Sequence, residues 1–257
     1  MKGAQEISLD GQPLSMVDEA VLLLSVTEAP PTETLSLLPR PTGGSLLLGR
    51  QRQSLTITAT VEIRESDPLL RQDILNKICR WMQGKTLTLS SRPEQYLQVV
   101  PTAYPARVQG EDWRTPITLG WQSTSFPWWQ QQTATTLSLT VAAEEATGTL
   151  LLPGNAHARL EATLLPQGST NPSRVRLLVG GQSLTLQGLP WQPGQVLRLT
   201  YTEGGVLQLL LGAQSVLSCR TGDSVDELIA PCGQPVAVTL ISDEPVQCLL
   251  SGRGCWL

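Results

Sequence analysis

The stretch that decides the fold is residues 54–64, SLTITATVEIR. Apolar and polar side chains alternate through all eleven residues, which is the period of a β-strand with one face buried and the other in water. The same alternation recurs in three later segments, residues 85–90, 117–121 and 136–141. Residues 19–27 form a more continuous apolar run, which predicts a strand covered on both faces. The sequence therefore predicts a mainly β protein.

A single helix is predicted over residues 67–83, where the alternation stops. Asp67 can accept the free amides of the first turn, and Pro68 fits the first helical position because its missing N–H costs nothing there. Gly84 is expected to take the left-handed conformation that ends many helices. One stripe of side chains recurs with the helical period and is expected to pack on a sheet. It consists of Leu70, Ile74, Leu75, Ile78, Trp81 and Met82.

Residues 29–53 contain four prolines and three glycines between short apolar runs. This stretch is too long for an ordinary turn and predicts an extended arm or hairpin that projects from the sheet. Its leucines need a surface to cover them, which a neighbouring subunit could provide. The candidate residues of this subunit-interface arm are Leu37, Leu38, Gly43, Gly44, Leu46, Leu47 and Leu48.

A domain boundary is expected near residues 143–156, which gives domains 1–147 and 148–257. Beyond it, short alternating segments separated by glycine-containing turns predict an antiparallel β-sandwich. The expected strands are residues 158–165, 174–179, 182–188, 195–202, 205–211, 214–219, 235–241 and 245–250.

The charge and hydrophobicity of the chain limit the classes of molecule that it is expected to bind. Only 16% of the 257 residues are charged and the net charge is -4, so the chain lacks the cationic clusters that tight nucleic-acid binding requires. Residues 1–147 carry 12 basic and 15 acidic side chains, and residues 148–257 carry 6 and 7. The apolar runs are far shorter than the ~18–20 residues of a membrane span, so no membrane insertion is expected. No secretory signal is apparent in the first residues.

The sequence contains few of the residue types and motifs that form catalytic sites. His157 is the only histidine, which excludes sites that need two or more histidines, and no nucleophile-elbow motif accompanies it. The five cysteines form no CxxC pair and are expected to be reduced, small buried side chains. We therefore predict no catalytic residue, no metal ligand and no cofactor.

The order of these features resembles the distal tail proteins of long-tailed, siphovirus-type bacteriophages and prophages. The resemblance spans nearly the whole chain and rests on the sequence of patterns. These are an early apolar strand (Val21–Val26), an arm with Gly43-Gly44, a long strand preceded by Arg50 and Arg52, a helix with Trp81 in its last turn, the strands at 85–91, 96–100 and 117–122, the segment Ser125–Trp129, and C-terminal segments at 230–240 and 253–256.

The resemblance implies a structural protein without catalysis. It implies an N-terminal β-sandwich or barrel-like, tail-tube-like domain with one helix and an arm, followed by a galectin-like or carbohydrate-module-like sandwich. Six copies would form a ring at the tail tip or baseplate of the virion, after synthesis in the host cytoplasm. The expected partners are other copies of itself, the tail tube, the tape-measure protein and the tail hub. Genome DNA would pass through the ring.

Two alternatives remain open at the sequence level. The first is a carbohydrate-binding module or adhesin, which would bind sugar through exposed aromatic rings. Its candidate sugar-stacking residue is Trp191, which lies in a predicted turn. The alternative interpretation of Trp191 is a side chain that seals the sandwich core. Gly212-Ala213-Gln214 stands where the resembling family usually has an aspartate, which weakens any inherited ligand site. A glycosidase would use two carboxylates, and the adjacent acids are Glu111-Asp112, Asp226-Glu227 and Asp243-Glu244.

Overall fold

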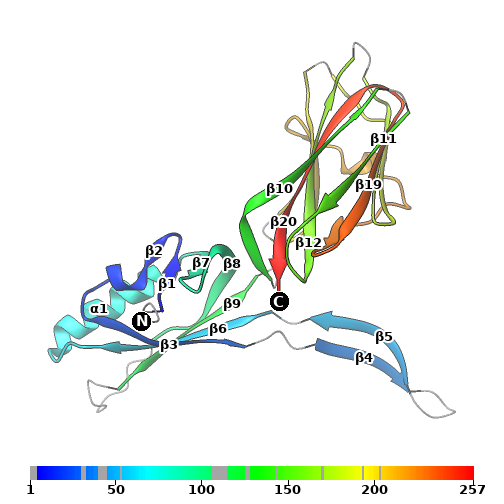
Figure 1. Cartoon of the computed structure of the whole chain (residues 1–257). Helices are drawn as coiled ribbons and strands as arrows, with labels where there is room; N and C mark the ends of the chain where they lie inside the picture. Colours follow the sequence, from blue (N-terminus) through cyan, green and yellow to red (C-terminus); the bar gives the residue numbers. More distant parts are fainter. Residues whose placement is uncertain are drawn as a thin grey trace. The chain divides into compact units, whose positions relative to one another are not determined.

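The computed structural model describes residues 5–29, 33–39, 45–52, 54–105, 115–124, 128–142, 144–168, 171–192, 194–202 and 204–257. Within 33–39 and 45–52 it describes the backbone, together with the side chains of Ser36 and Leu38. The described chain is mainly β with one α-helix, as the sequence predicts (Figure 1). It divides into two compact units, Met1–Trp129 and Gln130–Leu257.

The described residues of the first unit form seven strands besides the arm. They are β1 (Ile7–Leu9), β2 (Gln12–Pro13), β3 (Val21–Ala29), β6 (Thr56–Ile63), β7 (Thr86–Leu89), β8 (Arg92–Ala103) and β9 (Ile117–Ser123), with a 3₁₀ turn at Leu14–Met16. Neighbours pair antiparallel in the order β3–β6–β9–β8–β7–β1–β2. β8 pairs with β7 through its earlier residues and with β9 through its later ones, so this long strand joins two sheets around one core.

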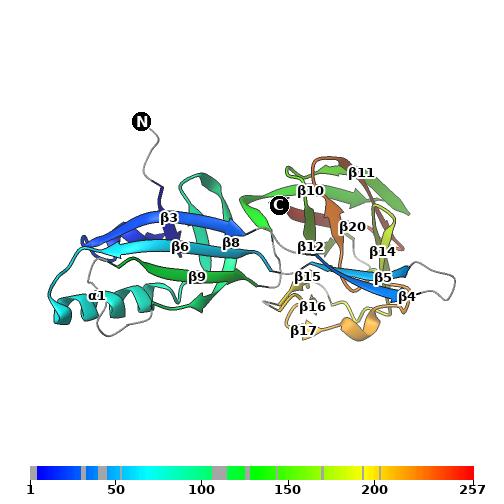
Figure 2. The same ribbon diagram turned by 90° about the horizontal axis from the view of Figure 1, so that it is seen from below.

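β6 confirms the strand predicted over residues 54–64. It lies between β3 and β9, and the three strands run side by side in Figure 2. Ile57, Ala59, Val61 and Ile63 are all 0% exposed, while the residues between them are partly exposed. The alternation of apolar and polar residues in the sequence therefore corresponds to a strand with one face in the core.

β3 corrects the expectation of a strand covered on both faces. Leu22 and Leu24 are 37% and 47% exposed. The register with β6 shifts between Leu23 and Ser25, which marks a β-bulge at this point. A bulge breaks the strict alternation of faces, so consecutive side chains at this point both face water. Among the described strands, β3 pairs only with β6 and is therefore an edge strand.

Helix α1 (Pro68–Trp81) confirms the predicted helix and its N-cap. An Asp67 carboxylate oxygen accepts the amides of Leu69 at 2.8 Å and Leu70 at 3.3 Å. The predicted C-terminal signal is wrong, because Gly84 does not have a positive φ. A Cβ added at Gly84 would lie 2.8 Å from the Cβ of Leu9, so glycine is needed there for the close approach of β1.

The helix packs on the sheet through its second half. Ile74, Leu75, Ile78 and Trp81 are buried, but Leu70, which the periodicity assigns to the same stripe, is 53% exposed. The Trp81 indole meets the ring of Trp121 edge-on, with centroids 5.9 Å apart and planes at 89°. Its Nε1–H donates to the Gln12 carbonyl at 2.8 Å, so this side chain ties the helix to both β9 and β2.

The predicted arm contains two antiparallel strands, β4 (Glu33–Pro39) and β5 (Ser45–Arg52). They pair from Glu33↔Arg52 to Pro39↔Ser45, with a bulge between Ser36 and Leu37. In the described part of the chain these strands form a two-stranded sheet of their own. Figure 1 draws them as a pair of neighbouring arrows.

The second unit is built from two sheets. Its elements are β10 (Trp129–Val141), β11 (Glu145–Leu151), β12 (His157–Pro166), β13 (Arg174–Val179), β14 (Gln182–Gln187), β15 (Leu197–Tyr201), β16 (Leu207–Leu211), β17 (Gln214–Ser215), a 3₁₀ turn at Leu217–Cys219, β18 (Ile229–Pro231), β19 (Pro235–Ser242) and β20 (Val246–Trp256). One sheet has the order β17–β16–β15–β12–β20–β10, and β18 also pairs with β12. The other has the order β11–β19–β13–β14.

The structure divides the chain earlier than the expected boundary after residue 147. β11 pairs with β19 along seven residues, from Glu145↔Ile241 to Leu151↔Pro235. β10 lies beside β20, the last strand of the chain. Residues 130–147 therefore contribute one strand to each sheet of the second unit, β10 beside β20 and β11 beside β19.

Trp81→Ala is expected to destabilise the first unit by about 3–5 kcal/mol, because it removes a buried aromatic ring and leaves a cavity. Leu69, on the same helix, is 79% exposed, so Leu69→Ala should change stability by less than about 0.5 kcal/mol. Urea denaturation measures both. A loss below about 1 kcal/mol for Trp81→Ala would show that the contact with Trp121 contributes little.

Residues 130–257 are expected to fold on their own, because both sheets of the second unit lie within them. A fragment starting at residue 152 lacks β10 and β11 and should be markedly less stable. Circular dichroism and thermal denaturation of the two fragments measure the difference. Equal stability would show that β10 and β11 are not integral parts of this unit.

Candidate functional site

The residues that catalysis would need are dispersed. His157 is exposed at the first position of β12. Within the described ranges, no three side chains of the His, Cys, Asp or Glu types gather closely enough to hold a metal ion. No helix among the described residues is long and apolar enough to cross a membrane.

Glu227, one of the candidate acids, belongs to a structural network. Its carboxylate pairs with the Arg159 guanidinium, which lies 4.7 Å from the centroid of the Tyr201 ring. The Tyr201 hydroxyl accepts the Leu228 amide at 2.9 Å, and burial raises the pKa of Tyr201 to about 12. The network attaches the loop before β18 to strands β12 and β15. The role visible for Glu227 is therefore to hold this loop.

Asp243 has a comparable structural role. Its carboxylate accepts the Ser173 hydroxyl at 2.5 Å and the amides of Ser173 and Arg174 at 3.1 Å each. Burial acts to raise the pKa of Asp243, but these hydrogen bonds outweigh it and hold the pKa below the usual value. The third acid pair, Glu111-Asp112, lies outside the described residues.

Trp191 does not present a surface for a sugar. Its side chain is 7% exposed, and its Nε1–H donates to the Gln195 carbonyl at 2.9 Å. A pyranose stacks on an exposed aromatic face, which this ring lacks. The position matches the alternative weighed in the sequence analysis, a tryptophan that seals the core.

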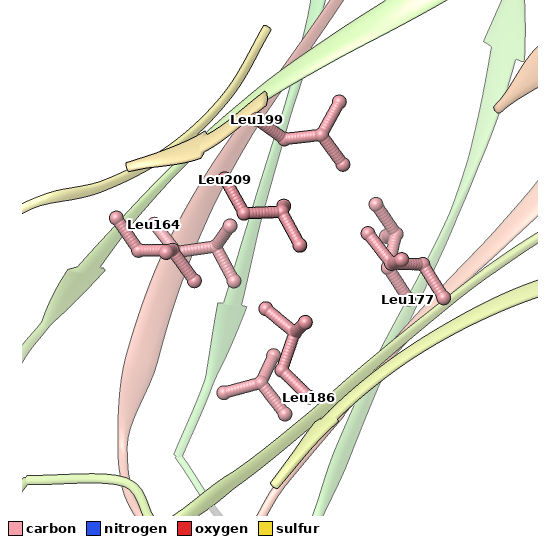
Figure 3. Close-up of a pocket in the computed structure, with 8 residues that line it drawn as sticks. Leu164, Leu177, Leu186, Leu199 and Leu209 are labelled. Carbon is pink, nitrogen blue, oxygen red and sulfur yellow. The ribbon is translucent and has the colours of Figure 1, made fainter. Parts of the chain in front are cut away.

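The apolar core of the second unit holds one small cavity among its described residues. A cavity of about 10 Å³ lies between its two sheets (Figure 3). All of its lining side chains are apolar: Leu164, Val175, Leu177, Leu184, Leu186, Leu197, Leu199 and Leu209. A single water needs at least that much space and polar partners. The cavity is therefore a small packing gap in the core.

The exposed side of β3 is the first feature suited to assembly. Leu22 and Leu24 are exposed apolar side chains on this strand, whose outer edge has no partner among the described strands and could pair with another chain. This surface is not predicted from the sequence. The run Val21–Leu24 predicts burial equally well in a core or in an interface, so hydrophobicity alone could not distinguish the two.

A polar cluster fixes the end of β3 that leads into the arm. One Glu28 carboxylate oxygen accepts the indole N–H of Trp129 at 3.1 Å and a guanidinium N–H of Arg92 at 3.2 Å. The Arg92 guanidinium also lies 5.1 Å from the centroid of the Trp129 ring. These contacts join β3 to β8 and to the last residue of the first unit. The arm therefore starts from a firmly held strand end.

The structure places the candidate arm residues only in part. Leu38, on β4, is 50% exposed. Leu37 lies on β4, and Leu46, Leu47 and Leu48 lie on β5, but the structure describes only their backbone. Gly43 and Gly44 lie outside the described residues. The arm as an interface stays a prediction.

The chain was compared with protein families, curated proteins and solved structures. No family model matches, and no curated protein matches. Two solved phage P2 baseplate structures, in the activated conformation with Ca and with Sr, align over 98% and 96% of this chain and 97% of each matched chain. They are 11% identical to it with TM-scores of 0.46 and 0.44, and similarity at that level does not bear on the fold.

The Dit protein of phage SPP1 is much more similar in structure. Its crystal structure is described as a paradigm of the hub adsorption apparatus in phages that infect Gram-positive bacteria. The alignment covers 98% of this chain and 99% of that chain, with a TM-score of 0.68 and 12% sequence identity. The chain therefore has the fold of the SPP1 Dit protein over nearly its whole length.

Proposed function

We propose that this protein is a distal tail protein, a structural component of the tail tip or baseplate of a long-tailed phage or prophage. The observation that carries the proposal is the fold shared with SPP1 Dit through both units, at a TM-score of 0.68. The dispersed acids and the exposed His157 agree with a structural role without catalysis. The protein would reside in the virion after synthesis in the host cytoplasm.

The first unit would assemble with copies of itself into a ring, which we propose to be hexameric. The edge strand β3 supplies free backbone groups and the exposed side chains of Leu22 and Leu24. The β4–β5 arm would lie across the next subunit and cover its own leucines, as the sequence analysis expects. The ring would connect the tail tube to the tail hub, with the tape-measure protein and the genome passing through its centre.

The second unit would be a galectin-like or carbohydrate-module-like sandwich. Its sheets enclose an apolar core, and the buried ring of Trp191 argues against sugar stacking at that residue. The partners considered for this unit are a receptor-binding protein and a host-surface glycan bound at a site other than Trp191.

The mass in solution tests the ring directly. Light scattering of the full chain at several concentrations should give an oligomer near six times the 27.8-kDa chain mass. A monomer that persists at all concentrations would contradict self-assembly.

Replacing residues 33–52 by a short Gly-Ser linker should abolish the ring and leave both units folded. The reason is that β4 and β5 pair only with each other among the described strands. Light scattering measures the assembly, and circular dichroism checks the fold. Val206 is 63% exposed on the second unit, so Val206→Ser is a matched control that should leave the ring intact. Rings formed without the arm would show that another surface holds the subunits together.

The protein should not retain duplex DNA, even at low salt. The acidic balance of residues 1–147 predicts a channel that repels phosphates, so the genome slides without sticking. A gel-shift experiment over a range of salt concentrations measures this. Retardation at low salt that disappears as salt rises would instead place arginines along the channel.

A further inference from the structure

Three backbone segments meet at one end of the second unit. They are residues 152–156, which lead into β12, the turn at 232–233 after β18, and residues 254–255 near the end of strand β20. The Cys232 amide donates to the Ala156 carbonyl at 2.8 Å, and the Gly233 amide donates to the Leu152 carbonyl at 2.7 Å. The Cys255 carbonyl accepts the amides of Asn155 at 3.0 Å and Ala156 at 3.1 Å. The backbones of Cys232 and Cys255 are therefore hydrogen-bonded to the same short segment, residues 155–156.

Glycines allow these segments to touch. A Cβ added at Gly154, whose φ is +121°, would lie 2.0 Å from the Cys255 carbonyl oxygen. A Cβ added at Gly233 would lie 2.6 Å from the Gly154 carbonyl oxygen, and one at Gly254 would lie 2.6 Å from the Pro153 carbonyl oxygen. No side chain fits between the backbones, so Cys232 and Cys255 are both held against residues 152–156.

The two thiols differ in a way that suits thiol–disulfide chemistry. Cys232 is 9% exposed, whereas Cys255 is 1% exposed. The Cys255 thiol donates to the Arg253 carbonyl at 3.3 Å. The side-chain interaction with Cys255 lowers the pKa of Cys232 to about 7, and the same interaction, with burial, raises the pKa of Cys255. A thiolate is the attacking species in disulfide exchange. Cys232 is therefore the more exposed of the two thiols and the one whose pKa is lowered, so it is the one expected to react first.

Cys248 differs from Cys232 in both the exposure and the pKa of its thiol. It is 0% exposed, and burial alone raises the pKa of its thiol to about 12. It is therefore inert toward oxidants in the folded protein.

We propose that Cys232 and Cys255 are a redox pair that closes to an intramolecular disulfide when the protein meets a small disulfide oxidant such as oxidised glutathione. The Cys232 thiolate attacks one glutathione sulfur, which forms a mixed disulfide and releases one glutathione thiolate. The Cys255 sulfur, losing its proton, then attacks the Cys232 sulfur and displaces the second glutathione. The two protein thiols lose two electrons and two protons, and one oxidised glutathione becomes two reduced ones.

The cross-link would hold the end of β20 against the turn that precedes β19. It encloses 22 residues, from Gly233 to Gly254, and restricts the unfolded chain. We therefore expect oxidation to raise the Tm of the second unit by roughly 5–10 °C. This inference concerns the second unit alone and does not depend on the proposed function.

Mass spectrometry of the native full-length protein tests the proposal. The protein is incubated with oxidised glutathione, alkylated and digested without reduction. Trypsin leaves Cys232 and Cys248 together in residues 221–253 and Cys255 in residues 254–257, so a second protease that cuts before Asp243 is needed to separate them. The expected product is a Cys232–Cys255 cross-linked peptide that has lost two hydrogens. Persistent glutathionylation of Cys232 without cross-link, or a cross-link to any other cysteine, would overturn the proposal.

Thermal denaturation with matched variants gives a second readout. The rise in Tm on oxidation should disappear in Cys255→Ser and persist in Cys248→Ala and in Cys219→Ser. Cys219 is the control for a partly exposed thiol. Should Cys255→Ser fail to fold, the peptide assignment in the unmodified protein still decides. A Tm that rises equally in Cys255→Ser would show that another reaction stabilises the protein.

Discussion

A two-stranded β-sheet has no second layer to cover it, and the β4–β5 arm is such a sheet. Its leucines cannot be buried by the arm itself, and Leu38 is half exposed in the single chain. The strand that leads into the arm has the same property, because Leu22 and Leu24 face water on the edge of the main sheet. The described residues Leu22, Leu24 and Leu38 therefore expose apolar surface, which the proposed ring would cover.

The rest of the first unit gives this surface a rigid support. Glu28, Arg92 and Trp129 hold the end of β3, and the edge-on contact of Trp81 with Trp121 fixes helix α1 on the sheet. Both arrangements join segments that are distant in the sequence. An arm that starts from a fixed strand end loses less conformational freedom on docking than one that starts from a mobile loop.

The sequence predicts the local features well. Strict alternation identifies β6, and Asp67 with Pro68 locates the start of α1, because these signals arise from the nearest neighbours along the chain. It fails where the outcome depends on distant partners. Leu70 has the right period for the core but lies beyond the sheet that would cover it, and Gly84 is required by its approach to Leu9 rather than by a helix end. The domain boundary depends on the pairing of β11 with β19, which no local pattern records.

The place of β20 has a consequence for how the chain is made. Of the strands in this sheet, β20 is synthesised last, yet it lies between β12 and β10 in the interior of the sheet. The first unit can fold while the second is still being synthesised. The second unit cannot close this sheet until β20 has been synthesised, since the missing strand would leave two inner edges open to water. During that interval the exposed edges of β10 and β12 are the part of the nascent protein most open to aggregation.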